Sequence, residues 1–429
     1  MSDINSMSRE LKKRQLRSRV ITPGEPRPRP QAQPPEEDGQ EVVKQAHRKV
    51  MWRRLIILAL LGILLAGFIG GFFWYQRYYQ FESITVGWER QLEREGNFTA
   101  YETFGTNLLR YSKDGASYID AAGKDVWVQS YEMRSPIVAV NGDYAAIADQ
   151  QGNNIYICDL NGCQGVATTV LPIIKVTVSA KGVVAAILED QTASASYIYF
   201  YRKDGTEIKL FIKGVLGGNI GYPLDISLSP DGTILIGSYA FIEGGMLKNR
   251  VAFYNFSEVG KNALNRFVGG FHDIYENSMV PRVRYLNDTY AVAFADNSIS
   301  FYTSADVMSP ALVTQVPVEE EIKSVFCSDK YAGIIVKSVS GEYDFRMDLY
   351  GVNGEKLFGV DFSYLYDHVD IDEDFIFLYN ENSCKIYNSH GILKYEGEFD
   401  FTVSKINKGS QPNQIIVAGP QVIKEIRLH

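Results

Sequence analysis

Histidine, cysteine and tryptophan are scarce in this chain, with five, four and four residues among 429. The histidines form no close pair at metal-ligand spacing, and the H-E-x-x-H motif of zinc hydrolases is absent. A G-x-S-x-G elbow and a nucleotide-binding P-loop are absent as well. We therefore predict no metal site, no cofactor and no catalytic residues from sequence motifs. The histidines are His47, His272, His368, His390 and His429.

Positive charge is scarce outside the N-terminal region. Residues 1–54 carry 13 Lys and Arg against 7 Asp and Glu, whereas the remaining residues carry 30 against 44. Nucleic-acid phosphates bind to basic surfaces. The acidic main part of the chain therefore argues against nucleic acid as its partner.

The chain has one long hydrophobic run, Leu55 to Tyr75. As a helix, its 21 uncharged residues would span roughly 31 Å, close to the ~30 Å hydrocarbon core of a bilayer. Basic residues crowd its N-terminal side, so the positive-inside rule predicts a cytoplasmic N-terminus and an extracytoplasmic C-terminal domain at the cell membrane. A cleaved signal peptide is the alternative, but the run exceeds the usual length of about 7–15 residues and no A-x-A site follows. The basic residues are Lys44, Arg48, Lys49, Arg53 and Arg54.

The segments on either side of this run lack the means to build a core. We predict that residues 1–54 form a disordered tail, because six of the 15 prolines lie between Pro23 and Pro35. The basic residues of the tail can contact anionic lipid or a cytoplasmic partner, or can serve only to fix the topology. Residues 76–82 are predicted to be a juxtamembrane linker.

Small residues form a stripe on the predicted membrane helix. Gly62, Ala66 and Gly70 lie four residues apart, and such a stripe permits two helices to approach closely. This spacing permits a homodimer through the helix. Glycine is also common in membrane helices for other reasons, so a monomeric anchor is the alternative.

The region from residue 83 to residue 429 repeats one pattern several times. The segments "NGDYAAIADQQGNNIYICD" (141–159) and "NDTYAVAFADNSISFYTS" (287–304) share a polar turn, an apolar strand, a second turn and a second strand. Intervals of roughly 40–55 residues with about four strands each are typical of β-propeller blades, whose sheets are buried on both faces. Copies begin near residues 107, 141, 181, 231, 287, 329, 372 and 411.

The two ends of the repeat region predict how the ring closes. The last copy supplies too few strands for a blade, and residues 83–92 form a spare strand. Propellers commonly complete the last blade with an N-terminal strand, which leaves no free sheet edge. We therefore predict an all-β, eight-bladed propeller over residues 83–429, with seven blades as the alternative.

The segment "LSPDGTILI" (228–236) resembles the strands of WD-repeat-like, TolB-like and quinoprotein-like propellers. The whole layout resembles an uncharacterised family of bacterial single-pass membrane proteins with an extracytoplasmic propeller. This resemblance implies an architecture and carries no activity or catalytic residues. A quinone cofactor is not expected, because such blades carry recurrent tryptophans and this domain has only Trp88 and Trp127.

Two local features invite a chemical interpretation. Cys158 and Cys163 flank the turn "DLNG", so a disulfide across the hairpin is chemically reasonable outside the membrane, with two free thiols as the alternative. The acidic segment "HVDIDED" (368–374) suggests calcium, but it lacks the spacing and the glycine of an EF-hand loop. We interpret it as an acidic turn between strands.

The sequence favours a binding or scaffolding module displayed in the cell envelope, with an envelope protein or a glycan as partner. Propellers hold loops around a central channel on a rigid frame, and binding sites gather on such loops. The alternatives are a hydrolase or lyase acting on envelope polysaccharide, and a sensor that signals through the tail. Unpaired acids and bases at one mouth of the channel would favour the enzyme.

Overall fold

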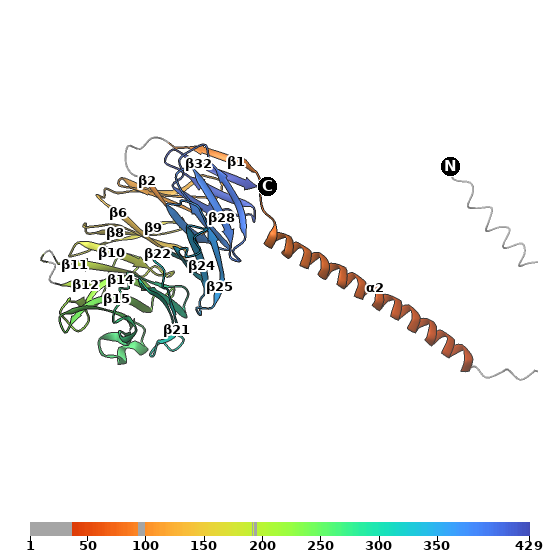
Figure 1. Ribbon diagram of the computed structural model, residues 1–429, viewed down its shortest axis with the longest axis horizontal. Coiled ribbons are helices and arrows are strands. Elements are labelled where there is room, and N and C mark those ends of the chain that lie inside the picture. The colour runs from red at the N-terminus through yellow and green to blue at the C-terminus, as the bar shows by residue number, and fades with distance from the viewer. Residues whose placement is uncertain (1–36, 93–98, 191, 193–194) are drawn as a thin grey trace, which may run out of the picture. The chain divides into compact units, whose positions relative to one another are not determined.

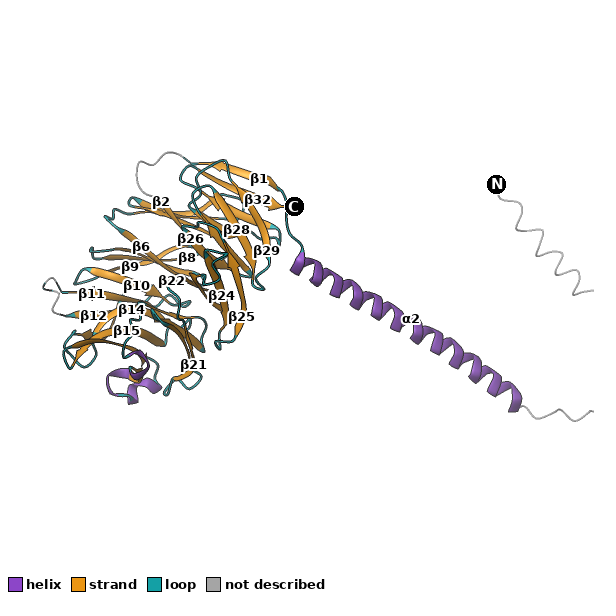
Figure 2. Ribbon diagram, viewed as in Figure 1, coloured by secondary structure: helices purple, strands orange, loops and turns teal. Residues whose placement is uncertain are grey.

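The computed structural model describes residues 37–92, 99–190, 192 and 195–429, which form one long helix, many strands and three short 3-10 helices (Figures 1 and 2). The chain divides into two units, residues 1–73 and residues 74–429, and each is described by itself. The 3-10 helices are η1 (Val259–Asn262), η2 (Leu264–Arg266) and η3 (Asp273–Tyr275).

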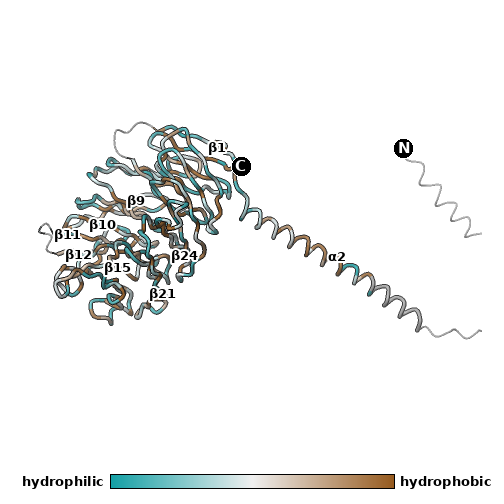
Figure 3. The backbone as a smooth tube through the Cα atoms, in the orientation of Figure 1, coloured by the Kyte–Doolittle hydropathy of each residue, from teal (hydrophilic) through white to brown (hydrophobic). Residues whose placement is uncertain are grey.

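The long helix α2 (Glu37–Tyr78) contains the hydrophobic run, visible in brown in Figure 3. Its part from Val50 to Tyr78 is long and apolar enough to cross a membrane. The helix begins at Glu37, so residues 37–54 are helical rather than part of a disordered tail as predicted. This segment follows the last proline of the tail and is rich in Glu, Gln, Ala, Lys and Arg, which favour helix. The rest of the predicted tail, residues 1–36, lies outside the described residues.

The second unit is a ring of eight four-stranded antiparallel sheets, which confirms the eight-bladed propeller. Blade 1 contains β2 (Thr99–Phe104), β3 (Asn107–Ser112), β4 (Gly115–Ile119) and β5 (Asp125–Ser130). Blade 2 contains β6 (Pro136–Asn141), β7 (Tyr144–Asp149), β8 (Asn154–Asp159) and β9 (Gly162–Thr168). Blade 3 contains β10 (Ile173–Val178), β11 (Val184–Glu189), β12 (Ser196–Tyr201) and β13 (Glu207–Gly214). Blade 4 contains β14 (Tyr222–Leu228), β15 (Ile234–Glu243), β16 (Met246–Asn255) and β17 (Phe267–Phe271).

The remaining blades continue in the same order, except that the last one takes its fourth strand from the start of the domain. Blade 5 contains β18 (Arg282–Tyr285), β19 (Tyr290–Phe294), β20 (Ser298–Thr303) and β21 (Ala311–Pro317). Blade 6 contains β22 (Ile322–Cys327), β23 (Tyr331–Lys337), β24 (Phe345–Gly351) and β25 (Lys356–Phe362). Blade 7 contains β26 (His368–Asp372), β27 (Phe375–Tyr379), β28 (Ser383–Asn388) and β29 (Leu393–Glu398). Blade 8 contains β30 (Lys405–Lys408), β31 (Gln414–Ala418), β32 (Val422–Leu428) and β1 (Ile84–Gln91).

Turn chemistry fixes where the strands reverse, as the turn before β15 illustrates. Asp231 accepts hydrogen bonds from the hydroxyl of Ser229 at 2.5 Å and from the backbone N–H of Thr233 at 3.0 Å. Burial alone would raise the pKa of Asp231, but these hydrogen bonds lower it overall. Gly232 has a φ of +76°, which a residue with a side chain rarely adopts. Aspartate followed by glycine therefore favours this turn.

The last blade closes the ring through β1. This strand pairs antiparallel with β32, from Ile84 opposite Leu428 to Gln91 opposite Val422. It also contacts blade 1, because the indole N–H of Trp88 donates to the carbonyl of Ala121 at 3.0 Å. Since β1 joins the last blade to the first, we call its contacts with both blades the seam.

The segment before β1 is held by blade 7. The buried amine of Lys394 donates to the carbonyl of Gln76 at 2.9 Å and to that of Tyr79, and the amide of Asn388 donates to the carbonyl of Arg77 at 3.0 Å. The last carbonyls of a helix have no partner within the helix and carry partial negative charge, so a cation and an amide satisfy them. The backbone N–H of Phe81 then donates to the carbonyl of Lys394 at 2.7 Å. Residues 76–78 of the predicted linker are therefore helical, and the residues that follow them are irregular and held by backbone hydrogen bonds.

We predict that Trp88→Ala lowers the free energy of unfolding by about 1–3 kcal/mol, because the half-buried indole loses packing and its hydrogen bond across the seam. Val86→Ala, on the same strand with a side chain that is 51% exposed, is the control and should cost no more than about 0.5 kcal/mol. Urea denaturation followed by circular dichroism measures both. Equal losses in the two variants would contradict a stabilising role of Trp88 at the seam.

Candidate functional site

The antiparallel order of each blade decides which connections share a face of the ring. The turns between first and second strands, and between third and fourth strands, lie on one face together with residues 79–83. We call this the terminal face. The turns between second and third strands lie on the opposite face together with the linkers between blades, and we call it the linker face.

The linker face is acidic across blades 5 to 8. Its seven connections between residue 272 and residue 404 contain eleven Asp and Glu residues and no Lys or Arg. A surface dominated by one sign of charge attracts partners of the opposite sign. We call these residues the acidic arc: Asp273, Glu276, Asp296, Glu319, Glu320, Glu321, Glu342, Asp344, Asp367, Glu381 and Asp400.

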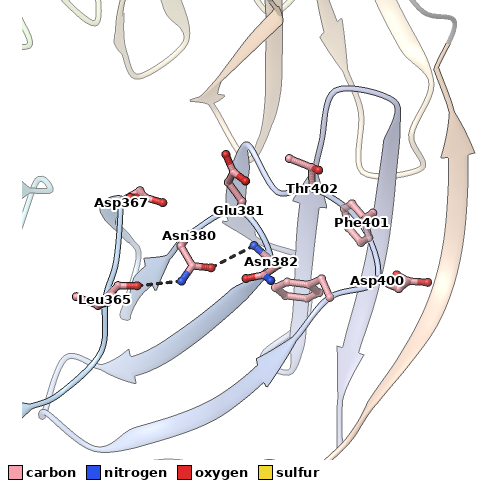
Figure 4. A pocket seen from close by; sticks show the side chains of 9 residues that line it. Leu365, Asp367, Asn380, Glu381, Asn382, Asp400, Phe401 and Thr402 are labelled. Carbon is pink, nitrogen blue, oxygen red and sulfur yellow. Dashed lines mark hydrogen bonds between the residues drawn. The ribbon is translucent and has the colours of Figure 1, made fainter.

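A pocket of about 650 Å³ opens on this face between blades 7 and 8 (Figure 4). Its walls come from three separate segments: the linker before blade 7, the turn between β27 and β28, and the linker before blade 8. The residues that line it are Leu365, Asp367, Asn380, Glu381, Asn382, Phe399, Asp400, Phe401 and Thr402.

The side chain of Asn380 shapes the rim of this pocket. Its Oδ1 accepts the backbone N–H groups of Asn382 at 3.1 Å and Ser383 at 3.0 Å, and its Nδ2 donates to the carbonyl of Leu365 at 2.9 Å (Figure 4). Asparagine favours such turns because its side chain bonds to the backbone two residues on. The turn is thereby tied to the linker before blade 7, with Glu381 at its tip.

Apolar side chains lie beside the acidic ones at this rim. Leu365 is 79% exposed, and half-buried Phe401 lies with its ring centre 4.8 Å from the amine of Lys424. Lys424 also pairs with Asp400 at 3.2 Å and with Glu89 of the seam at 3.4 Å. Burial alone would lower the pKa of Lys424, but the two carboxylates raise it overall. On the Phe401 side of the pocket, the carboxylate of Asp400 is thus already paired with a cation of the same chain, Lys424.

Two carboxylates of the pocket have no such partner. Asp367 and Glu381 form no ion pair with any residue in the described part of the chain. By contrast, Glu320 and Glu321 of the acidic arc pair with Arg346 at 3.2 Å and with Lys323 at 2.7 Å. The uncompensated charge of the pocket therefore lies on the side of blade 7, next to Leu365.

The innermost strands carry charges that pair across blades. The amine of Lys405 in blade 8 lies 3.1 Å from Asp370 in blade 7 and 3.6 Å from Glu102 in blade 1. The hydroxyl of Tyr379 donates to the same oxygen of Asp370 at 2.7 Å. Burial alone would lower the pKa of Lys405, but the two carboxylates raise it, so the side chain is charged at neutral pH. This charge links three successive blades.

A second set of charges links blades 3, 4 and 5. The amine of Lys175 lies 2.5 Å from the fully buried side chain of Asp225, whose second oxygen accepts the backbone N–H of Val283 at 2.8 Å. These acids and bases satisfy one another. Such an arrangement stabilises the ring and does not leave a general acid or base free for chemistry.

The acidic segment singled out in the sequence lies in blade 7 on the terminal face. Residues 368–372 form β26, and Glu373 and Asp374 form the turn that follows it. The amine of Lys408 pairs with Glu373 and lies 2.8 Å from Asp374. Among the residues that the structure describes, no group of three or more His, Cys, Asp or Glu side chains is arranged to hold a metal ion.

The other predicted site residues lie apart from the pocket. Cys158 and Cys163 face each other across β8 and β9 of blade 2 as thiols. Gly62, Ala66 and Gly70 lie on α2, and a Cβ added at either glycine would meet nothing within 4 Å among the described residues outside the backbone of the helix itself. Close packing of two helices there stays a prediction. The pocket residues were missed because no motif marks three short turns that meet only in the ring.

Residues 77–428 match the sequence model of a family of unknown function, DUF5711. No curated protein matches the chain. Among solved structures, Sqt1 of Chaetomium thermophilum bound to the N-terminus of the ribosomal protein L10 is similar, with a TM-score of 0.50 and 10% identity over 81% of this chain and 98% of that chain. The WD40 domain of Pan2 from Neurospora crassa is similar with a TM-score of 0.43 and 8% identity, over 82% and 97%. At these identities, the likeness shows the propeller fold alone.

We predict that Lys405→Met lowers the free energy of unfolding by about 1–3 kcal/mol, because it leaves Asp370 and Glu102 without their cation. Lys408→Met, on the same strand, is the control and should cost less than about 1 kcal/mol, because its partners are mostly exposed. Urea denaturation of both variants measures the difference.

The raised pKa of Lys405 sets the pH range of this effect. The contribution of the Lys405 charge is present at neutral pH and is lost as the pH rises through that raised value. Equal costs for the two variants at pH 7 would contradict the role assigned to Lys405.

Proposed function

The chain belongs to the DUF5711 family of unknown function, and we propose that it is a binding module whose linker face holds a polypeptide partner at the pocket between blades 7 and 8. A β-propeller of WD40 type is commonly a binding or scaffold module. The observation that carries the proposal is the composition of the pocket: exposed Leu365 beside the unpaired carboxylates of Asp367 and Glu381. Exposed apolar side chains rimmed by charge are typical of protein interaction sites.

The chemistry of the pocket defines the partner that it fits. A polypeptide segment with Lys or Arg next to an apolar residue would pair with Asp367 and Glu381 and cover Leu365. The acidic arc extends this preference over blades 5 to 8, so that it would steer a basic partner towards the pocket. A neutral, apolar partner would leave both carboxylates dehydrated and unpaired, which is costly.

We propose further that α2 anchors the propeller in the cell membrane, with the N-terminus in the cytoplasm and the propeller in the cell envelope. The apolar part of α2 and the excess of Lys and Arg before it support this orientation. Within the second unit, the chain enters the ring on the terminal face, and the pocket lies on the opposite, linker face. A homodimer through Gly62, Ala66 and Gly70 would present two such faces.

Two other functions remain as alternatives, an enzyme and a sensor. A hydrolase or lyase acting on envelope polysaccharide would need free acids and bases, whereas the charges of Lys405, Asp370, Lys175 and Asp225 are engaged with one another. A sensor would bind a ligand at the propeller and signal that binding to the N-terminal tail. The pairing of these inner charges argues against a catalytic site on the innermost strands.

We predict that crosslinking of the full-length protein in cells recovers a specific protein partner, and that Glu381→Lys weakens the binding of that partner by at least tenfold, about 1.4 kcal/mol. The reason is that the variant turns an attraction for a basic segment into a repulsion. Affinity is measured with the purified full-length protein in detergent, and it should also fall as salt rises.

The matched control is Leu264→Ser, which removes a side chain that is 85% exposed on the terminal face. It should leave affinity unchanged, whereas Leu365→Ser on the linker face should weaken it. Unchanged affinity in Glu381→Lys would contradict the proposed site. Recovery of glycan without protein, and of shortened glycan above all, would contradict the binding module and favour the enzyme.

A further inference from the structure

Blade 2 contains two cysteines that oppose each other across a hairpin. Cys158 of β8 and Cys163 of β9 are directly opposite each other in the strand register. Opposed residues in antiparallel strands have Cα atoms about 4.5–5.5 Å apart. A disulfide requires about 4.4–6.8 Å. The backbone therefore already has the spacing of a disulfide.

The two thiols differ in their access to solvent. Cys158 is fully buried and packs with Phe104 and Tyr118 of blade 1. Cys163 is half-buried. It follows Gly162, the first residue after the two-residue turn. A reagent in solution can therefore reach Cys163 directly, and can reach Cys158 only through Cys163.

The two thiols also differ in acidity. The neighbouring thiol of Cys158 outweighs the effect of burial and lowers the pKa of Cys163 to about 7. The presence of Cys163, together with burial, raises the pKa of Cys158. The thiolate is the nucleophilic form of cysteine. At neutral pH, the nucleophile is thus the accessible sulfur of Cys163, and the thiol of Cys158 is buried next to it.

We propose that Cys163 and Cys158 form a thiol–disulfide exchange site, in which Cys163 attacks a low-molecular-weight disulfide and Cys158 resolves the product. In the first step, the Cys163 thiolate attacks one sulfur of the small disulfide, whose S–S bond breaks to release one thiolate. In the second step, Cys158 gives up its proton and attacks the sulfur of Cys163, which releases the second thiolate. The net reaction oxidises two cysteine thiols to one disulfide and reduces one small disulfide to two small thiols.

This inference goes beyond the proposed binding function, because blade 2 contributes no residue to the pocket of blades 7 and 8. The disulfide would close a very short loop, so it would add little to stability through chain entropy. Its effect would be local. The indole N–H of Trp127 in blade 1 donates to the carbonyl of Asp159 at 3.1 Å, so the hairpin that carries the cysteines also supports the contact between blades 1 and 2.

The test uses the purified full-length protein in detergent, reduced and then incubated with oxidised glutathione. We expect mass spectrometry to find a disulfide between Cys158 and Cys163 with no glutathione retained. In Cys158→Ser, the reaction should stop with one glutathione on Cys163. In Cys163→Ser, the buried Cys158 should react at least tenfold more slowly than Cys163 does in the unaltered protein. Cys384→Ser, which changes a buried cysteine of blade 7, should behave like the unaltered protein.

Two further readouts separate exchange chemistry from simple oxidation. The rate of alkylation of Cys163 by iodoacetamide should rise with pH with a midpoint near 7, and Cys158→Ala, which removes the neighbouring thiol without replacing it by another donor, should move that midpoint upwards. Fluorescence should fall on oxidation and should not fall in Trp127→Phe. Persistence of the glutathione adduct in the unaltered protein would overturn the proposal, as would an alkylation midpoint in the ordinary thiol range. Circular dichroism confirms that each variant is folded.

Discussion

The structure depends on one constraint: every blade has two apolar faces, and each needs a neighbouring blade to cover it. Strand β7 illustrates this, because Ala145 and Ile147 pack towards blade 1 while Ala146 and Ala148 pack towards blade 3. A row of such sheets buries all its faces only when its ends meet, so the pairing of β1 with β32 stabilises every interface in the ring and not only blade 8. The buried ion pairs of the innermost strands add to this, because Lys405 alone contacts carboxylates of two other blades.

A closed ring also explains why the candidate site lies on connections rather than on strands. The strands are committed to the core, as β27 and β31 show with every residue buried, and they leave little side-chain surface for a partner. The connections are free to vary, yet they are held rigidly: Asn380 binds the backbone of its own turn and of the neighbouring linker. Such loops on a rigid frame combine variable chemistry with fixed geometry. The pocket residues Leu365, Glu381 and Phe401 come together only because blades 7 and 8 are adjacent in the ring.

The architecture could be predicted from the sequence, whereas the site could not. The repeat of a polar turn followed by an apolar strand, as in "YAAIAD" (144–149) and "YAVAFAD" (290–296), reveals blades because a sheet buried on both faces needs apolar residues throughout. It allowed eight blades to be counted in spite of the long β15–β16 hairpin and the segment with η1 to η3. The start of α2 at Glu37 was missed because proline and charge dominated the interpretation of the tail, although the residues after the last proline favour helix. The charges of Lys405 and Glu102 could not be paired in advance, because they lie near opposite ends of the domain and meet only when the ring closes.

The docking of the residues before β1 has a mechanical consequence. Tension applied along α2 would reach β1 at its first residue, which is the end from which an antiparallel strand unzips one hydrogen bond at a time. Just before that point, Lys394 and Asn388 donate hydrogen bonds to the backbone carbonyls of residues 76, 77 and 79. The load is therefore delivered to the β28–β29 hairpin of blade 7, which is covered by neighbours on both sides, and the strand that closes the ring is shielded from peeling. Lys394 thus takes up force at residues 76 and 79 before that force reaches β1.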